Sequence, residues 1–173
     1  MKTIEKTETY QAASKIVFQY LDDLGVTGMH MTQSSMMMGS KLNFEFLSEN
    51  KKGPGTKYRL TGKMMGMKMD FTVAVTQWIA GVEKIWETLG TSQRIIYSWY
   101  RMHLKLSRKP EGTEAKLSIS YERPVGIFYR IISFLFADWY CRWCLKSMLG
   151  DCEKLLKQRE QSGQLEHAAT IHN

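Results

Sequence analysis

Three cysteines in the last third of the chain are the first residues whose spacing could do chemistry. Cys141 and Cys144 form a Cys-x-x-Cys motif, and Cys152 follows in the same helical pattern. A thioredoxin-like redox motif begins a helix after a strand, whereas this motif lies in the middle of a helix. A structural zinc site needs a fourth ligand, and the sequence gives no spacing argument for His30 or His103. We therefore interpret the cysteines as small core residues and predict neither a metal site nor another cofactor.

Two other residues could take part in proton transfer. His30 lies in a methionine-rich connection, from which its imidazole could reach the mouth of a pocket. Asp138 is the one charged residue on an otherwise apolar helical stripe. His103 shares a strand face with Tyr97 and Arg101, and we expect that face to be the outer one. His30 and Asp138 are therefore the general acid/base candidates, and the catalytic residues of an enzyme stay unknown.

Asp138 has three competing interpretations. It could N-cap a second helix after a kink near Phe136, because Asp accepts hydrogen bonds from the first free N–H groups of a helix. It could pair with Arg142, one turn later, on a partly solvated face. It could also anchor a polar group of a ligand, where burial would raise its pKa unless a partner compensates. The sequence leaves these three open.

Length and charge limit the function classes. The 173 residues suffice for one domain that buries roughly 70% of its unfolded surface, and we expect it at residues 1–160 with a loose tail at 161–173. The net charge is +7, but the basic residues are scattered among acidic ones and form no nucleic-acid-reading motif, so we predict no nucleic-acid partner. The first residues lack an apolar signal region and the cysteine count is odd, which favours a reducing, cytoplasmic location.

A long helix is predicted from Ile127 to Gln158, with Pro124 and Gly126 suited to its start. One stripe at the helical period is apolar except for Asp138, and its members are Ile127, Ile131, Phe134, Cys141, Leu145, Met148, Leu149, Cys152 and Leu156. The apolar stretch of residues 125–140 is too short and too interrupted to span a bilayer, so we predict no transmembrane segment.

The opposite face of this helix is also apolar near its start, where it carries Ile132, Phe136, Trp139 and Trp143. A contiguous apolar surface of this kind must be covered. The chain's own loops, a second subunit in a homodimer or a membrane surface would each cover it. The sequence does not choose among these.

Short alternating segments precede the helix. Thr3–Tyr10 is predicted to be a strand, and Lys15–Asp23 a helix that Ser14 caps and Gly25 ends. Six hairpin-linked strands follow, punctuated by Gly, Pro and Asn, within residues 42–46, 57–64, 67–76, 82–89, 95–106 and 117–121. This order predicts an α+β fold, with a curved antiparallel sheet of about seven strands and a long C-terminal helix.

The order of elements and three local patterns resemble the SRPBCC, or START-like, superfamily, in particular its polyketide cyclase/dehydrase and lipid-transport branch. The patterns are Gly55–Arg59 with Gly66–Asp70 and Val75–Trp78, then Glu83–Thr88, and finally Arg123–Gly126 with Asp138–Leu145. The resemblance covers residues 3–158. It implies a helix-grip fold, in which the sheet wraps around the long helix and encloses a hydrophobic cavity. Family members bind lipids, sterols, polyketides or other bulky apolar molecules, and some catalyse cyclisation or dehydration.

We therefore predict that a bulky hydrophobic small molecule or lipid binds between the sheet and the C-terminal helix. The expected lining consists of the inward-facing residues Phe44, Tyr58, Leu60, Met69, Phe71, Tyr100, Met102, Ile119, Phe134, Asp138 and Cys141. Non-catalytic binding or transport is the favoured function. The alternatives are an enzyme of the cyclase/dehydratase type, and a protein-interaction module that uses the aromatic outer face of the helix.

Overall fold

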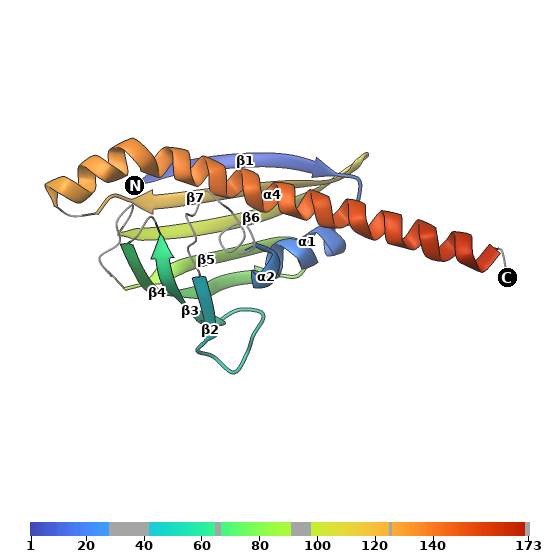
Figure 1. The fold of residues 1–173 in the computed structure, drawn as a ribbon, viewed down its shortest axis with the longest axis horizontal. Helices are drawn as coiled ribbons and strands as arrows, with labels where there is room; N and C mark the ends of the chain where they lie inside the picture. Colours follow the sequence, from blue (N-terminus) through green and yellow to red (C-terminus); the bar gives the residue numbers. More distant parts are fainter. Residues whose placement is uncertain (28–41, 65–66, 91–97, 125, 172–173) are drawn as a thin grey trace.

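The computed structural model describes residues 1–27, 42–64, 67–90, 98–124 and 126–171, and of these it leaves the side chains at 27, 42, 63–64, 67–69, 128, 132 and 163–171 undescribed. Seven strands form one antiparallel sheet in the order β1-β7-β6-β5-β4-β3-β2 (Figure 1). Their bounds are β1 (Lys2–Tyr10), β2 (Leu42–Phe46), β3 (Lys57–Met64), β4 (Met67–Ile79), β5 (Glu83–Leu89), β6 (Trp99–Lys109) and β7 (Gly112–Glu122). With the long C-terminal helix, this sheet confirms the predicted α+β helix-grip fold.

Alternation along the strands separates the two faces of the sheet. In β6 and β7 every second residue is buried, namely Tyr100, Met102, Leu104 and Leu106, and then Ala115, Leu117, Ile119 and Tyr121. The residues between them are exposed or half-buried, because successive side chains of a strand point to opposite faces. The pairing of β4 with β5 shifts between Val75 and Gln77, and an irregularity of this kind bends a strand and increases the twist of the sheet.

A glycine allows β1 to end close to the β6–β7 hairpin. Gly112 has φ 140°, and a Cβ atom there would lie 2.1 Å from the carbonyl oxygen of Tyr10. Only a residue without a side chain fits this approach. The next residue, Thr113, donates a hydrogen bond from its hydroxyl to the carbonyl of Ala12 at 2.7 Å. The connection that follows β1 is therefore fastened to the start of β7.

Two short helices follow β1, and their ends differ from the prediction. Helix α1 spans Ser14–Asp22 and α2 spans Leu24–Thr27. Ser14 is the first helical residue, and the N-cap is Ala13, whose side chain makes no capping bond. The predicted cap was therefore wrong by one position. The helix also ends before Gly25, because Asp23 adopts an extended backbone and its carboxylate accepts the N–H of Gly25 at 2.7 Å.

The C-terminal helix, α4, spans Ile127–Ile171, so its predicted start is confirmed. It packs against β1, β7, α1 and α2, and its C-terminal end runs beyond the sheet (Figure 1). The helix includes residues 161–171, which the sequence pattern assigned to a loose tail. It is also continuous through Asp138, so the interpretation of that residue as the N-cap of a second helix is wrong.

The buried face of α4 follows the predicted stripe only in its later part. Cys141, Leu145, Met148, Leu149, Cys152 and Leu156 are buried as predicted. Ile127, Ile131 and Phe134 are exposed instead, and the buried residues of this first part are Ser133, Ala137 and Tyr140. The first turns therefore present a different face to the sheet. A prediction that applies one helical period to the whole helix misses this rotation of the buried face.

Candidate functional site

The inner face of the sheet forms one continuous apolar surface with α4. Seven of the predicted lining residues are buried in the same hydrophobic cluster, namely Tyr58, Leu60, Phe71, Tyr100, Met102, Ile119 and Cys141. Phe44 is partly buried and packs against this cluster. The side chain of Met69 and all of His30 lie outside the described residues. The structure thus brings together side chains from β2, β3, β4, β6, β7 and α4.

Phe134 and Asp138 do not belong to this cluster. Phe134 is 66% exposed, and the guanidinium of Arg123 lies 5.1 Å from the centre of its ring. Asp138 is half-buried at the edge of the sheet, beside β1 and β7. Placing them on the inner lining was an error of helical phase, because the buried face of α4 at this level runs through Ser133 and Ala137.

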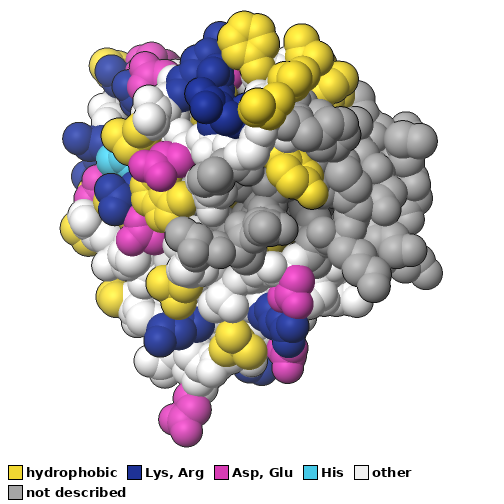
Figure 2. Space-filling view, turned by 90° about the vertical axis from the view of Figure 1, so that its left-hand side faces the viewer, with side chains coloured by type: hydrophobic (Ala, Val, Ile, Leu, Met, Phe, Trp, Pro, Cys, Tyr) yellow, Lys and Arg dark blue, Asp and Glu magenta, His cyan; other side chains and the backbone are white. Residues whose placement is uncertain are grey.

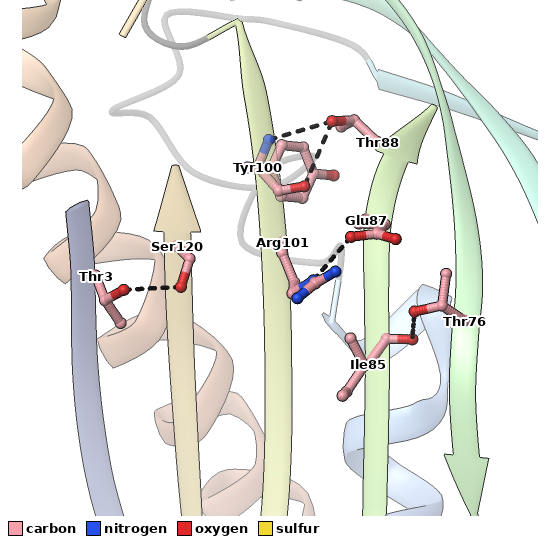
Figure 3. Close-up of polar contacts among 8 residues, drawn as sticks. All are labelled: Thr3, Thr76, Ile85, Glu87, Thr88, Tyr100, Arg101 and Ser120. Atoms are coloured by element: carbon pink, nitrogen blue, oxygen red, sulfur yellow. Dashed lines mark hydrogen bonds and ion pairs between the residues drawn. The ribbon is translucent and has the colours of Figure 1, made fainter. Parts of the chain in front are cut away.

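An aromatic pair lies at the centre of the inner face. The rings of Phe71 and Tyr100 meet edge to face with centroids 5.9 Å apart, although β5 runs between their strands. On β5, Thr88 pairs with Val73, two residues after Phe71. The Thr88 hydroxyl donates to the carbonyl of Tyr100 at 3.4 Å and accepts its N–H at 3.1 Å (Figure 3). The Thr88 side chain thus continues the β5–β6 pairing beyond the last backbone pair, Glu87 with Arg101, and holds the backbone of Tyr100 in place.

Tyrosine hydroxyls are among the polar groups of this interior. Burial raises the pKa of Tyr58, and the neighbouring Tyr100 raises it further. Burial likewise raises the pKa of Tyr140, with Cys144 and Tyr100 adding to the effect. These phenols are therefore neutral at physiological pH, and a neutral phenol both donates and accepts a hydrogen bond. They can bind the polar group of a ligand, but they are poor general bases.

Three buried side-chain polar atoms have no hydrogen-bond partner within the described part of the chain, namely the hydroxyls of Thr56 and Ser133 and the indole nitrogen of Trp78. The hydroxyl of Ser133 is fully buried on the inner face of α4, and no hydrogen bond to it is formed within the described part of the chain. A buried unpaired hydroxyl costs roughly 1–3 kcal/mol, so such groups usually have a water or ligand partner. Sequence reasoning missed this residue, because the predicted inward stripe does not include Ser133. The phase of the helix turns it inward.

Two other tyrosines use their hydroxyls to hold α4. Tyr10 donates to the carbonyl of Leu149 at 2.8 Å, in a buried environment. Tyr121 donates to Oδ1 of Asp138, and Lys2 forms an ion pair with Oδ2 of the same carboxylate. The bonds from Lys2 and Tyr121 hold the pKa of Asp138 below its usual value. Asp138 is therefore an ionised tether between α4 and the first and last strands, and it is not poised for proton transfer.

The cysteines are free and buried. Burial raises the pKa of Cys141 and of Cys152 to about 12, and it also raises that of Cys144. A thiol becomes a nucleophile or a metal ligand only as the thiolate, so these pKa values oppose both roles at neutral pH. No group of three potential metal ligands occurs among the described residues.

A buried ion pair lies at one side of this interior. The ammonium of Lys84 lies 2.7 Å from Oδ1 of Asp22 and donates to the carbonyl of Asp22 at 3.0 Å. It also lies 5.0 Å from the ring centre of Trp86. The pair fastens the end of α1 to the inner face of β5. Sequence reasoning missed it, although a charge at an inward position of the alternation Lys84, Trp86, Thr88 was the available signal.

Two hollows with fully described walls open on the surface. One, of about 570 Å³, lies between the β1–α1 connection and the β6–β7 hairpin. The other, of about 250 Å³, separates the end of β1 from residues 153–160 of α4. The second includes Tyr10 and Leu156 of the hydrophobic cluster in its wall, but neither hollow is lined by any of the predicted ligand-contact residues. Both are therefore distinct from the predicted ligand cavity.

Comparison with known proteins gives fold relatives only. No family model and no curated protein matches the chain. Among solved structures, a norcoclaurine synthase from Thalictrum, in complex with a transition-state analogue, is similar at TM-score 0.65 and 14% identity, covering 92% of this chain and 96% of that one. The protein TTHA0849 from Thermus thermophilus is similar at 0.64 and 16%, with 88% and 95% covered. An aromatase/cyclase from Streptomyces is similar at 0.63 and 15%, with 90% and 95% covered.

This chain has the same helix-grip fold as these solved structures. The resemblance that the sequence patterns carried is thereby confirmed for the fold. At these levels of identity the site residues of the relatives are not transferable. Within the described residues no helix is long and apolar enough to cross a bilayer.

Proposed function

We propose that this protein binds a bulky, mainly hydrophobic small molecule, such as a lipid or a polyketide-like compound, between the inner face of its sheet and α4. The observation that carries the proposal is the pairing of an apolar, aromatic inner face with the unpartnered hydroxyl of Ser133. Ligand sites of this type combine apolar walls with a few polar groups that orient the ligand. The hydroxyl of Tyr58, neutral at physiological pH, is a further polar group of this face.

The packing of α4 supports this location. The helix packs along β1 and β7, at one end of the strand order, and against α1 and α2. The inner faces of β3 and β4 belong to the other half of the sheet, and they still bury Tyr58, Leu60, Phe71 and Val73. A ligand held between these two halves would contact the Phe71–Tyr100 pair at their junction. This geometry suits a molecule larger than a single side chain.

Catalysis of the cyclase or dehydratase type is the second candidate. It is favoured by the fold relatives that are named as an aromatase/cyclase and a norcoclaurine synthase. In this chain the described inner face offers neutral tyrosines as proton donors and hydrogen-bond donors. Asp138 is a weak candidate for the base, because its carboxylate is already engaged by Lys2 and Tyr121. A non-catalytic binding role therefore fits the described residues better.

Ligand occupancy tests the proposal without a guess at the ligand. Purified protein is analysed by native mass spectrometry, and an organic extract of the same sample is analysed in parallel. We also expect a neutral apolar fluorescent probe, N-phenyl-1-naphthylamine, to bind the folded protein with submillimolar affinity. Met102→Trp should weaken that binding at least about tenfold, because the larger side chain fills space on the inner face.

The matched control is Ile79→Trp, which adds the same ring at an exposed position near the end of β4. It should leave the probe affinity unchanged. A probe that fluoresces only with unfolded protein, or that binds Met102→Trp and the native chain equally while both remain folded, would show that the inner face holds no ligand. Measured turnover that a Tyr58→Phe substitution abolishes, with binding intact, would favour the enzyme over the binding protein.

A further inference from the structure

The first part of α4 carries an unusual concentration of exposed hydrophobic side chains. Within the described part of the chain, seven large hydrophobic residues between positions 127 and 139 are exposed: Ile127, Tyr129, Ile131, Phe134, Leu135, Phe136 and Trp139. Figure 2 looks at the end of the molecule where α4 begins and shows hydrophobic side chains gathered at its upper edge, beside Lys and Arg side chains. A contiguous apolar patch of this kind on a folded domain marks an interaction site.

Three of these residues, Ile131, Leu135 and Trp139, share the side of the helix that is opposite its buried face. Ser133, Ala137, Tyr140 and Cys144 are buried against the rest of the protein. At 100° per residue, Ile131, Leu135 and Trp139 lie on the side that faces away from them. Leu135 is 61% exposed and Trp139 is 50% exposed. The first turns of α4 therefore pack with one face and expose apolar side chains on the other.

The charges around this surface are mainly positive. Between residues 123 and 146 the chain has four basic residues, Arg123, Arg130, Arg142 and Lys146, and one acidic residue, Asp138. The carboxylate of Asp138 is neutralised by Lys2. Arg130, Arg142 and Lys146 are exposed. The partner of this surface must therefore accept apolar side chains and attract several positive charges.

An anionic lipid surface has both properties. Its headgroups attract Lys and Arg, and its interface accommodates Trp and Tyr together with aliphatic side chains. A helix that lies in the interface buries one apolar face and keeps its basic residues at the headgroup level. A second copy of the chain fits less well, because a two-fold interface would place the same arginines and lysines opposite each other.

We propose that residues 127–146 of α4 dock this protein onto membranes that contain anionic lipids, with the helix lying along the surface. Ile131, Leu135 and Trp139 insert among the acyl chains, while Arg142 and Lys146 contact the headgroups. The proposal does not depend on ligand binding, since it uses the outer face of α4 and the ligand site uses the inner one. Membrane contact at this position would place the proposed ligand site next to the bilayer.

Vesicle flotation tests the docking surface. Purified protein is mixed with vesicles of phosphatidylcholine alone, or of phosphatidylcholine with phosphatidylglycerol. We expect binding to the anionic vesicles that weakens as salt is added, and much weaker binding to the neutral ones. Leu135→Glu should weaken the vesicle affinity by about tenfold or more, because a charge replaces an inserted apolar group. Arg142→Gln should weaken it about fivefold, the effect of one basic charge at a membrane surface.

Leu47→Glu is the matched control, since Leu47 is 51% exposed in the segment after β2 and lies outside α4. It should bind anionic vesicles like the native chain. Failure of the native chain to float with anionic vesicles, or equal flotation of Leu135→Glu and native protein, would overturn the proposal. Sedimentation velocity of the same samples identifies the competing occupant: a dimer that Leu135→Glu dissociates, without vesicle binding, would assign the face to a second copy. The affinity of Leu135→Glu for the fluorescent probe is measured on the same samples. This measurement tests the ligand site independently of the docking surface.

Discussion

Replacing Lys84 by Met tests whether the ion pair on the inner face holds α1 to the sheet. The side chains of Lys84 and Asp22 are only 5% and 6% exposed, and their charged atoms lie 2.7 Å apart. Burial lowers the pKa of Lys84, and the carboxylate of Asp22 opposes that effect. Lys84→Met keeps most of the volume and the contact with Trp86, but it leaves the carboxylate of Asp22 buried without its cation.

The expected loss is large because the remaining charge is unpaired. Breaking a buried ion pair on one side costs about 3–5 kcal/mol, compared with a total of about 5–15 kcal/mol for a typical domain. For a domain of this size, about 2–4 °C of melting temperature corresponds to each kcal/mol, so Tm should fall by about 6–20 °C. Urea unfolding followed by circular dichroism measures the free energy of unfolding, and differential scanning calorimetry measures Tm.

The double variant Lys84→Met/Asp22→Leu provides the matched comparison. Replacing both members of a buried pair by apolar groups is often neutral or stabilising, so the double variant should recover most of the loss of Lys84→Met. A loss below about 1 kcal/mol in the single variant would place the pair in the range of solvent-exposed salt bridges. A double variant as unstable as the single one would show that packing, and not the unpaired carboxylate, caused the loss. Either result would refute the reasoning.

The stability difference between the native chain and Lys84→Met should change with pH in a definite direction. The pKa of Lys84 is lower in the folded state than in the unfolded chain. The unfolded state therefore binds more protons at pH values between the folded pKa and the ordinary lysine value. In that window stability rises with pH. Lys84→Met lacks this contribution, so the native chain should gain stability relative to the variant as the pH increases through it.

Two further predictions concern α4. The thiols of Cys141, Cys144 and Cys152 should not react with a thiol reagent at pH 8 in the folded protein, because burial raises their pKa values. All three should react after unfolding. One fast-reacting thiol in the folded protein would disprove their assignment to the core. Asp138→Asn should lower the free energy of unfolding by about 1 kcal/mol or less near pH 7, because the pair with Lys2 is partly solvated, and should leave probe affinity unchanged. The folded-state pKa of Asp138 is depressed, so its contribution to the free energy of unfolding is present above the usual carboxyl pKa and is lost as the pH falls through the folded pKa. The urea midpoints of the native chain and of Asp138→Asn should therefore converge in acid. A difference that stays constant with pH would indicate that Asp138 acts through its shape and not its charge.

The buried, inward-facing positions could be predicted on the strands but not on part of the helix. Tyr58, Leu60, Phe71, Tyr100 and Met102 were found from alternation alone, because a period of two fixes the face of every residue once one is known. On α4 the prediction of Phe134 failed. The buried face of α4 shifts along the axis, from Ser133 and Ala137 to Leu145 and Cys152, and this shift depends on tertiary contacts that a helical period does not contain.

The sequence by itself determined the order of the elements, the seven strands, the start of α4 at Ile127 and the placement of the cysteines in the core. These follow from periodicity, turn residues and burial preference, all of which are local. Only the tertiary structure decided the partners of the polar side chains. Asp138 meets Lys2 and Tyr121, and Lys84 meets Asp22, across separations of 136, 17 and 62 residues. Such pairs form because the sheet brings distant segments together, and no local pattern encodes which segments will meet.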